Sequence, residues 1–495
     1  MPDPCEVSSI AGIVHGVAVG EPANLLVVSD LHFGEELLPG AADERCEAVK
    51  LGAEAFCAFL AYQAVRRLGG RTWRLVIAGD LFDFMSVVIP GTIELPATTA
   101  DERRLGLGRS IAAGVPRMAA ICEVQRPVLD ALVAFVTAGH EVEIVVGNHD
   151  VELLEPGVVD ELGRHLRRAG ATDQVLARIR VVPWFVYVPG VAWIEHGHVY
   201  DEGCSFEFNL APHDPRDGRL IFNADYAAIR YLGMASPEID PHGIEEWSFA
   251  GFLRYATGQG WRAFVRMITA YLRFMGSLIA ANLLHQSPAR RLARRTVHRQ
   301  RVEHEARAAG LPIETVRAID RLARAPLTVS WRRLSRLLVL DKWGMIGGTL
   351  LVATILLLTA PRWVCVLGLA ICVAAMAIAQ ARLGKHLVTS QLPMRAVPRR
   401  LRELVDVPVV VFGHTHDPRW QPIVGGGLYI NCGTWLPALR PGLRRSFTHV
   451  LVQPRPDGKP VVELRQWRDG ASLPFDDRAD LGAGVTSPGL PRIAG

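Results

Sequence analysis

Short apolar runs alternate with longer amphipathic stretches in the first 200 residues. Five of these runs have the length of a β-strand: Leu25–Ser29, Arg74–Ala78, Glu141–Val146, Ile179–Val188 and Val191–Glu195. Most are too apolar to face water on either side, so we expect buried strands. Between them, Glu44–Leu68 and Val115–Thr137 carry apolar residues at i, i+3 and i+4, which predicts helices packed on a sheet. The pattern is typical of a layered α/β domain.

The pattern changes in the middle of the chain. From about Cys204 to Leu404 the strand pattern disappears, and the composition becomes helical, aromatic and rich in arginine. Strand-like runs return at Val407–Phe412, Leu428–Asn431, Phe447–Gln453 and Val461–Gln466. We therefore expect one α/β domain made of residues 1–203 and 405–469, interrupted by a helical lid insertion over residues 204–404. Residues 470–495 are rich in Gly, Pro and Asp and are expected to form a flexible tail.

Two uncharged runs lie inside the predicted insertion. Gly344–Ala360 and Val364–Gln380 are separated by only three residues, and each would span roughly 25 Å as a helix. We predict a transmembrane hairpin at about 337–381; a buried helical hairpin within a soluble lid is the alternative. Arginine and lysine are concentrated on both flanks and scarce in the turn. Both flanks, and with them the α/β domain, are therefore expected on the cytoplasmic side of the cytoplasmic membrane.

The segment before the hairpin is also amphipathic. Phe264–Leu284 mixes large apolar residues with arginine, and Arg290–Arg301 is densely basic. Such a segment can lie as a helix on an anionic leaflet, or it can present a solvated charged face. The sequence leaves both interpretations open.

The composition narrows the class of protein. The 495 residues carry 54 basic and 50 acidic side chains, a formal net charge of +4, and 49% of them are hydrophobic. These values exclude a disordered, collagen-like or small disulfide-stapled protein, and the near balance of charge argues against a dedicated nucleic-acid binder. The eight cysteines are scattered without a CxxC pair and are expected to be reduced. The amino-terminal residues do not have the pattern of a secretory signal.

Residues that can bind metals follow the predicted strands. Three blocks read Asp30-Leu31-His32, Gly79-Asp80-Leu81-Phe82-Asp83 and Gly147-Asn148-His149-Asp150, and two later blocks read Glu195-His196-Gly197-His198 and Gly413-His414-Thr415-His416. Strand ends meet at one edge of an α/β sheet, so these side chains are expected to converge there. Carboxylate, amide and imidazole donors without cysteine suit Mn²⁺, Fe²⁺ or Zn²⁺ and indicate a dinuclear centre.

The five blocks resemble the pattern of the calcineurin-like metallophosphoesterase superfamily, which reads DxH, GDxxD, GNH[DE], a GH or HG element and GHxH. The resemblance covers residues 24 to 200 and 405 to about 467. It implies a four-layer αββα sandwich with two divalent metal ions, Mn²⁺ being favoured, between two facing mixed sheets. Carried over by position, the first metal would be held by Asp30, His32 and His416, the second by Asn148, His196 and His414, and Asp80 would bridge both. A hydroxide shared by the metals would attack phosphorus in line.

The resemblance also implies roles for neighbouring residues. His149 would contact the phosphate or protonate the leaving oxygen, and Asp83 would orient His149 through its second ring nitrogen. Asp150 would brace the loop. In the fourth block either His196 or His198 can be the ligand; we favour His196 because it follows the strand directly.

The place of the insertion is similar to that of the lid in UDP-2,3-diacylglucosamine hydrolases, which share HG at the fourth block and GHTH at the last. Those enzymes usually carry Arg where His149 stands, and their lids lack a transmembrane hairpin. A membrane-bound lid suits a substrate whose acyl chains stay in the leaflet. We therefore expect a membrane-associated phosphoesterase that hydrolyses a phosphoester or pyrophosphate bond of a lipid-linked or nucleotide-lipid substrate.

Three alternatives remain open. A tethered nucleotide phosphodiesterase or nuclease would use the same centre, and so would a phosphoprotein phosphatase. A non-catalytic scaffold on the same fold would have lost metal ligands, whereas every expected ligand type is present here. The substrate-binding residues and the oligomeric state are not indicated by the sequence.

Overall fold

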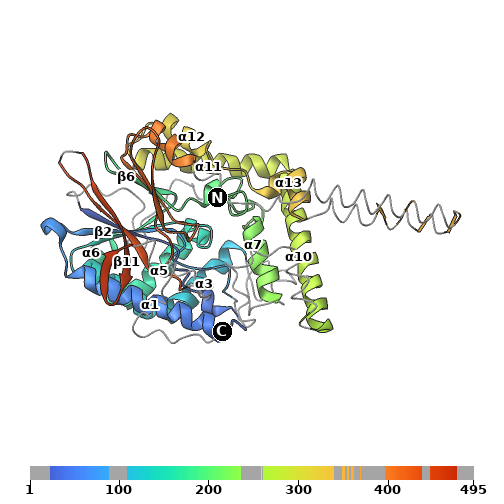
Figure 1. Ribbon diagram of the computed structural model, residues 1–495, viewed down its shortest axis with the longest axis horizontal. Coiled ribbons are helices and arrows are strands. Elements are labelled where there is room, and N and C mark those ends of the chain that lie inside the picture. The colour runs from blue at the N-terminus through green and yellow to red at the C-terminus, as the bar shows by residue number, and fades with distance from the viewer. Residues whose placement is uncertain are drawn as a thin grey trace.

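The computed structural model describes residues 23–38, 40–87, 109–235, 260–338, 396–437, 446–456 and 458–475, together with residue 258 and a few single positions between 348 and 368. Two mixed β-sheets lie together on the left in Figure 1, and helices pack around them. The predicted mixed α/β class is therefore confirmed.

The larger sheet has seven strands in the order β12-β11-β10-β1-β2-β3-β4. They are β1 (Asn24–Val28), β2 (Trp73–Ala78), β3 (Glu141–Val145), β4 (Ile179–Val182), β10 (Thr448–Gln453), β11 (Val461–Arg468) and β12 (Ala471–Pro474). Strands β1 to β4 are parallel, and β10 to β12 continue the sheet in antiparallel pairs. Every residue of β1 and β2 is buried, as expected for strands covered on both faces.

The smaller sheet has five strands in the order β5-β6-β7-β9-β8. They are β5 (Phe185–Val188), β6 (Ala192–Glu195), β7 (Val409–Phe412), β8 (Arg419–Pro422) and β9 (Leu428–Asn431). The three central strands are parallel, and β5 and β8 pair antiparallel at the edges. Ala192 of β6 pairs with Val409 of β7, so neighbouring strands of this sheet come from opposite ends of the predicted insertion.

The two sheets pack face to face around one apolar core. It combines side chains from both sheets, among them Val27 and Val76 from the larger and Ile194 and Val411 from the smaller. All four side chains are inaccessible to water. At roughly 25 cal/mol per Å² of apolar surface, burial of this kind is the main force that holds the sheets together.

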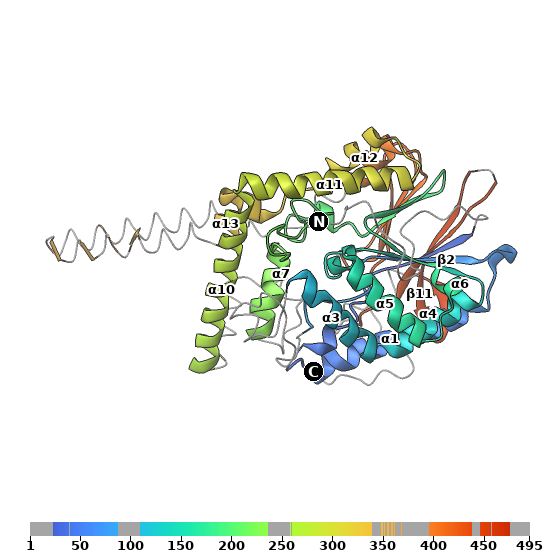
Figure 2. The same cartoon turned by 180° about the vertical axis from the view of Figure 1, so that it is seen from behind.

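Helices cover the outer face of the larger sheet. They are α1 (Asp43–Ala64), α3 (Ile111–Val124), α4 (Arg126–Thr137), α5 (Pro156–Arg168) and the short α6 (Asp173–Leu176). Helix α1 packs against α4, and α3 packs against α5 (Figure 2). Phe56 and Phe59 of α1 contact Trp435 in the core.

Between β6 and β7 the described residues are mainly helical. The helices are α7 (Ala224–Ala228), α10 (Trp261–His285), α11 (Pro288–Ala308), α12 (Ile313–Asp320), α13 (Trp331–Leu337) and α17 (Val397–Leu404). In both views α11 and α12 lie along one side of the molecule, and α10 stands at its end. A second and larger apolar cluster, called the main cluster, includes Phe56 of α1 and Leu129 of α4. One face of α10, including Phe274 and Leu278, is buried in this main cluster.

Three predicted elements differ from the structure. The predicted helix Val115–Thr137 is two helices broken at Gln125, because Pro127 in the first turn of α4 has no N–H to donate. The predicted strand Ile179–Val188 is divided at Pro183, and its two parts lie in different sheets. The start of the predicted flexible tail forms β12, which pairs with β11 through a tight turn.

The predicted transmembrane hairpin at about 337–381 lies almost entirely outside the described residues. Within the described part of the chain, the helix Trp261–His285 is long and apolar enough to cross a membrane. One third of its apolar window is buried inside the protein. Length and composition alone do not separate such a helix from a core helix.

Candidate metal centre

The side chains predicted to bind metals converge where strands of the two sheets end. They follow β1, β2 and β3 of the larger sheet and β6 and β7 of the smaller one: Asp30, His32, Asp80, Asn148, His196, His414 and His416. The first five are buried, and the two histidines of the last block are half-buried. Several groups of three side chains here bring their potential ligand atoms within 4.8 Å of one another. Buried His and Asp groups could therefore hold a metal ion at this edge.

Five of these residues have a backbone conformation that residues other than glycine rarely adopt. The angle φ lies between 51° and 69° at Asp30, His32, Asp80, His414 and His416. In the described part of the chain, only two further non-glycine residues have a positive φ. Each such position costs about 1–3 kcal/mol, and such positions gather at functional sites. The concentration of strain makes this edge a candidate functional site.

Glycine precedes two of the predicted ligands because a larger residue would collide with the centre. A Cβ atom at Gly79 would strike the ring of His196, and one at Gly147 would strike the carboxylate of Asp80. Gly79 also has a φ of 89°, which glycine adopts readily. The glycines in the second and third blocks thus allow the strand ends to approach closely.

Asp30, His32 and His416 form the first group of candidate ligands. The Nε2 atoms of His32 and His416 lie 3.2 Å apart, and His416 Nε2 lies 3.1 Å from Asp30 Oδ1. His32 Nε2 is 3.9 Å from a carboxylate oxygen of Asp30 and from one of Asp80. Imidazole nitrogens and carboxylates therefore share one small space, as in sites for first-row divalent metals.

In the second group, hydrogen-bond acceptors face one another. His196 Nδ1 lies 2.9 Å from the carbonyl oxygen of Ala78 and donates to it, because a carbonyl only accepts. In the neutral ring, Nε2 then carries a lone pair, and it lies 3.0 Å from Asn148 Oδ1 and 3.1 Å from Asp80 Oδ2. Three buried acceptors at these distances are unfavourable unless a proton or a metal cation lies among them.

The pKa values in this group also indicate that a positive charge is favourable here. Burial alone would lower the pKa of His196, but the Asp80 carboxylate raises the pKa to about 9. Burial tends to raise the pKa of Asp80, yet His196 and His149 bring it well below its usual range. A proton therefore satisfies the acceptors when no metal is bound, and a divalent cation can replace that proton. The donor set fits a divalent metal.

His414 is oriented by a residue outside the five blocks. Its Nε2 lies 3.2 Å from Asp201 Oδ2, and its backbone N–H donates to Asp30 Oδ2 at 3.0 Å. Burial tends to raise the pKa of Asp201, but the hydrogen bond with His414 brings it below its usual value. A carboxylate on Nε2 leaves Nδ1 for a metal, and ligating histidines commonly have such a partner.

His149 lies between two carboxylates. Its Nδ1 is 3.6 Å from Asp83 Oδ1, and its Nε2 is 3.6 Å from Asp225 Oδ2. Ser86 fixes Asp83 by donating from its N–H at 3.1 Å and from its hydroxyl at 2.9 Å. Burial tends to lower the pKa of His149, but Asp80 and Asp83 raise it well above its usual value. The two carboxylates therefore favour the protonated ring, which is the form that a general acid requires.

Asp150 and His198 occupy different places. Asp150 Oδ1 accepts from the Gly147 N–H at 2.6 Å and Oδ2 from the Leu81 N–H at 2.9 Å, so this carboxylate closes the loop. Burial raises the pKa of Asp150 to about 7. The rings of His196 and His198 lie 5.4 Å apart, and His198 Nδ1 has no hydrogen-bond partner among the described residues. His196 is the member of this pair that contacts Asp80.

Sequence reasoning missed two acidic residues of this centre. Asp201 follows the fourth block by three positions, and Asp225 lies in α7. A lone aspartate outside a motif carries no signal, because its place is decided by how the chain after β6 folds back. Both residues were found only through their contacts with predicted ligands.

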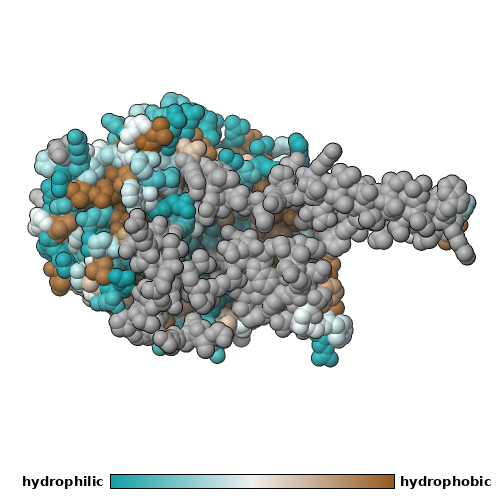
Figure 3. Space-filling view, in the orientation of Figure 1, coloured by the Kyte–Doolittle hydropathy of each residue, from teal (hydrophilic) through white to brown (hydrophobic). Residues whose placement is uncertain are grey.

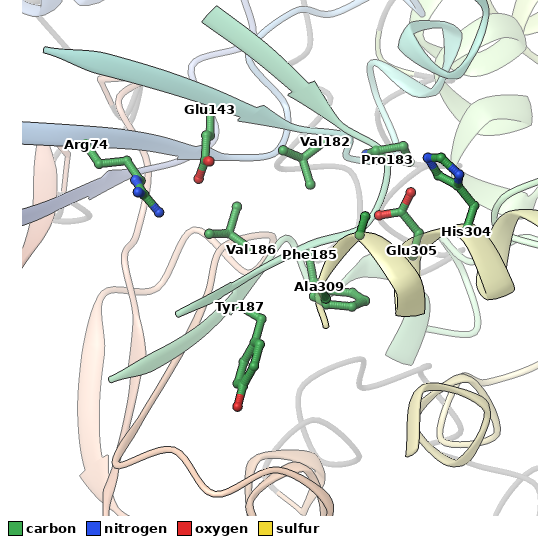
Figure 4. Close-up of a pocket in the computed structure, with 11 residues that line it drawn as sticks. Arg74, Glu143, Val182, Pro183, Phe185, Val186, Tyr187, His304, Glu305 and Ala309 are labelled. Atoms are coloured by element: carbon green, nitrogen blue, oxygen red, sulfur yellow. The ribbon is translucent and has the colours of Figure 1, made fainter. Parts of the chain in front are cut away.

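A pocket elsewhere in the molecule does not involve the five blocks. Figure 4 shows Arg74 and Glu143 from the larger sheet on one side of it, and His304 and Glu305 from α11 on the other. Burial raises the pKa of Glu305 to about 7. As far as the described residues extend, no predicted ligand lines this pocket, so we assign it no part in the metal chemistry.

Comparisons with known proteins do not add to this description. A scan against models of protein families finds no match. A search of curated proteins also finds no match. The interpretation of the site therefore rests on its own geometry and on the resemblance of the five blocks.

Proposed function

We propose that this chain is a membrane-associated, metal-dependent phosphoesterase of the calcineurin-like type, which hydrolyses a phosphoester or pyrophosphate bond. The observation that carries the proposal is the group of buried acceptors at the strand ends. His196 Nε2 lies 3.0 Å from Asn148 Oδ1 and 3.1 Å from Asp80 Oδ2, an arrangement that needs either a proton or a metal cation. Nitrogen and oxygen donors of these types suit Mn²⁺, with Fe²⁺ or Zn²⁺ as alternatives.

In this proposal seven residues hold two metal ions. The first would be held by Asp30, His32 and His416, the second by Asn148, His196 and His414, and Asp80 would contribute to both. When bound, two such ions activate water as a nucleophile and neutralise phosphoryl oxygens. The strained backbone and the glycines fix these side chains before any substrate arrives.

His149 holds the proton that the leaving oxygen requires. Asp83 lies beside its Nδ1, and Ser86 holds Asp83, so the ring has a defined orientation. Burial tends to lower the pKa of the ring, but Asp80 and Asp83 raise it well above its usual value, which favours the protonated form that an acid needs. A positioned acid of this kind typically contributes about 10²–10⁴-fold to a rate.

The packing of layers supports the resemblance to this superfamily. The two sheets share one apolar core, and α1 and α4 lie with the larger sheet in the main cluster. Val316 of α12 and Leu401 of α17 belong to the same cluster as Phe412 and Tyr429 of the smaller sheet. A four-layer αββα sandwich accounts for this arrangement.

Exposed apolar residues support association with a membrane. In the first uncharged run, Leu351, Ile355 and Leu358 are helical and 62%, 50% and 80% exposed. On α10, Trp261 and Leu272 are 73% and 61% exposed, and Figure 3 shows apolar surface on this helix where it stands clear of the grey residues. Moving such surface out of water gains roughly 25 cal/mol per Å². A lipid-linked substrate, such as a nucleotide-lipid, fits an enzyme held at the cytoplasmic leaflet.

The activity can be tested with purified protein in detergent and Mn²⁺. Mass spectrometry would follow UDP-diacylglucosamine beside a generic aryl phosphodiester, for the wild type, His149→Ala and the control His304→Ala. We expect the wild type and the control to cleave the lipid nucleotide, and His149→Ala to be slower by about 10²–10⁴-fold.

Other outcomes separate the alternatives. Cleavage of only the aryl diester would support the proposed hydrolysis and contradict the proposed lipid substrate. Faster turnover of cyclic nucleotides or nucleic acid would favour a tethered nucleotide phosphodiesterase, and turnover of phosphopeptides would favour a phosphoprotein phosphatase. A protein that holds metal and cleaves none of these substrates would be a scaffold.

Membrane association is tested by a separate variant. Replacing residues 344–380 with a short Gly-Ser linker should move the protein from the membrane fraction to the soluble fraction, because the two uncharged runs are removed. The Mn²⁺ content should stay unchanged. A variant that remains in the membrane fraction would show that α10 or another surface is sufficient for binding.

A further inference from the structure

The helical insertion brings a carboxylate to the metal centre. Asp225 lies in α7, and its Oδ2 accepts a hydrogen bond from Asn148 Nδ2 at 3.0 Å. The same oxygen lies 3.6 Å from His149 Nε2. The Asp225 side chain is 16% exposed, so these contacts are largely shielded from water. The five blocks assign no role to this residue.

Asp225 is held firmly by its neighbours. Asn223 caps α7 by accepting from the Tyr226 N–H at 2.8 Å, and the carbonyl of Gly203 accepts the Asp225 N–H at 3.2 Å. Arg117 of α3 donates to the Tyr226 hydroxyl at 3.2 Å. These bonds connect α7 to the loop after β6 and to α3, so the backbone that carries Asp225 is anchored.

The contact with Asp225 determines which way the Asn148 amide points. A carboxylate only accepts, so Asn148 must turn its Nδ2 toward Asp225. Its Oδ1 then faces His196 Nε2 at 3.0 Å, on the side of the predicted second metal. If the amide were reversed, it would present N–H groups to the metal, which cannot act as ligands.

We propose that Asp225 is a positioning residue that the insertion supplies to the metal centre. It orients Asn148 so that the amide oxygen can bind the second metal, and it thereby makes the insertion part of that site. This inference rests on the proposed function, because it requires a metal at Asn148. Outer partners of metal ligands typically account for about 10–100-fold in metal affinity.

Titration of metal-free protein in detergent with Mn²⁺ tests the role directly. Isothermal titration calorimetry would give the dissociation constants of both sites for the wild type, Asp225→Ala and Asp225→Asn. Asp225→Ala should weaken one site by about tenfold or more. Asp225→Asn should stay within about threefold of the wild type, because its amide oxygen can still accept from Asn148 Nδ2.

A double-mutant cycle shows whether Asp225 acts through Asn148. Asn148→Ala alone should weaken the same site, and adding Asp225→Ala should then have little further effect, because the orienting contact is already lost. Asp173→Ala is the matched control, since Asp173 is also an acidic residue in the first turn of a short helix but lies outside the centre. The control should leave both dissociation constants unchanged.

The outcomes separate this inference from the proposed function. Wild-type affinity in Asp225→Ala, or full additivity with Asn148→Ala, would overturn the role of Asp225 and leave the phosphoesterase proposal intact. A wild type that binds no Mn²⁺ would overturn both. If Asp225→Ala does not fold, Asp225→Ser provides the same comparison, because serine is favourable near a helix start and is too short to reach Asn148.

Discussion

The strand ends and the insertion are constructed in opposite ways. At the strand ends, five candidate ligands have a positive φ, and Gly147 leaves no room for a Cβ atom beside Asp80. In the insertion, α10 and α11 are regular helices of 25 and 21 residues, and none of the described residues lies within 4 Å of a Cβ added at Gly276. Among the described residues, five of the seven non-glycine positions with a positive φ lie where chemistry is proposed, so the strain is concentrated there.

Such strain persists only because the surrounding core holds it in place. With about 1–3 kcal/mol at each of the five positions, the centre opposes folding, and the buried sheets must offset that cost. Helix α10 of the insertion carries no such energetic cost, so its sequence can change more freely. Substitutions in the two regions should therefore affect different properties of the protein, and by different amounts.

The largest effect is expected at Asp80, which lies between the two groups of ligands. Asp80→Asn keeps the size of the side chain but removes the charge that both metals would share. Hydrolysis in the Mn²⁺ assay should fall by at least about 10³-fold, beyond the roughly 10–100-fold typical of outer partners. Unchanged hydrolysis would mean that the strand ends are not the catalytic centre.

In the insertion, the substitution to compare with Asp80→Asn lies in a buried ion cluster around Glu207. Glu207 accepts from His285 Nδ1 at 2.8 Å and from Arg294 Nη2 at 2.8 Å. Glu207→Ala should destabilise the protein by about 3 kcal/mol, because it leaves the buried guanidinium of Arg294 without its partner. Mn²⁺ affinity should remain that of the wild type. A large loss of affinity, measured with chemical denaturation as the control for folding, would show that the two regions are more tightly coupled than the comparison implies.

Alanine scanning of two glycines sharpens the contrast. Gly147→Ala should lower the free energy of unfolding by about 1–3 kcal/mol, because the new methyl group overpacks against Asp80. Gly276→Ala should raise it by about 0.5–1 kcal/mol, because alanine is favoured in a helix and open space receives its methyl group. Urea denaturation measures both. Equal effects would remove the distinction between a crowded centre and a tolerant insertion.

The response to pH provides a separate test. Burial lowers the pKa of His449 in β10 to about 3, so between about pH 6.5 and 3 the native protein binds fewer protons than the unfolded chain. Stability should therefore fall as pH decreases through this window, by up to about 1.4 kcal/mol per unit from this residue. Denaturation curves of the wild type and His449→Gln at several pH values would isolate this loss of stability, which should grow as pH falls toward 3 in the wild type and be absent from the variant.

The stability of the insertion should begin to fall at a lower pH than the stability that depends on His449. Burial tends to raise the pKa of Glu207, but hydrogen bonds from His285 and the charges of Arg294 and Arg291 bring it below its usual 4.5. Its stabilising effect is thus complete above pH 4.5 and is lost as pH falls further. A loss of helix content in the insertion above pH 5 would contradict this assignment.

The sequence predicted the parts of the molecule that depend on local pattern. Asp30, Asp80 and Asn148 could be placed because each directly follows an apolar strand, and neighbouring strand ends must meet. Asp225 could not be placed, because its contact with Asn148 spans 77 positions and depends on how α7 packs. The division of the run Ile179–Val188 between two sheets was likewise hidden, since its apolar pattern continues on both sides of the break.

The central claim is that the strand ends hold two divalent metal ions. The most direct measurement is the metal content of protein purified with Mn²⁺, determined by inductively coupled plasma mass spectrometry for the wild type and His196→Ala. We predict two Mn²⁺ ions per wild-type chain and the loss of at least one in His196→Ala, because the variant removes a nitrogen from the facing acceptors. A folded wild type without a bound transition metal would contradict the account.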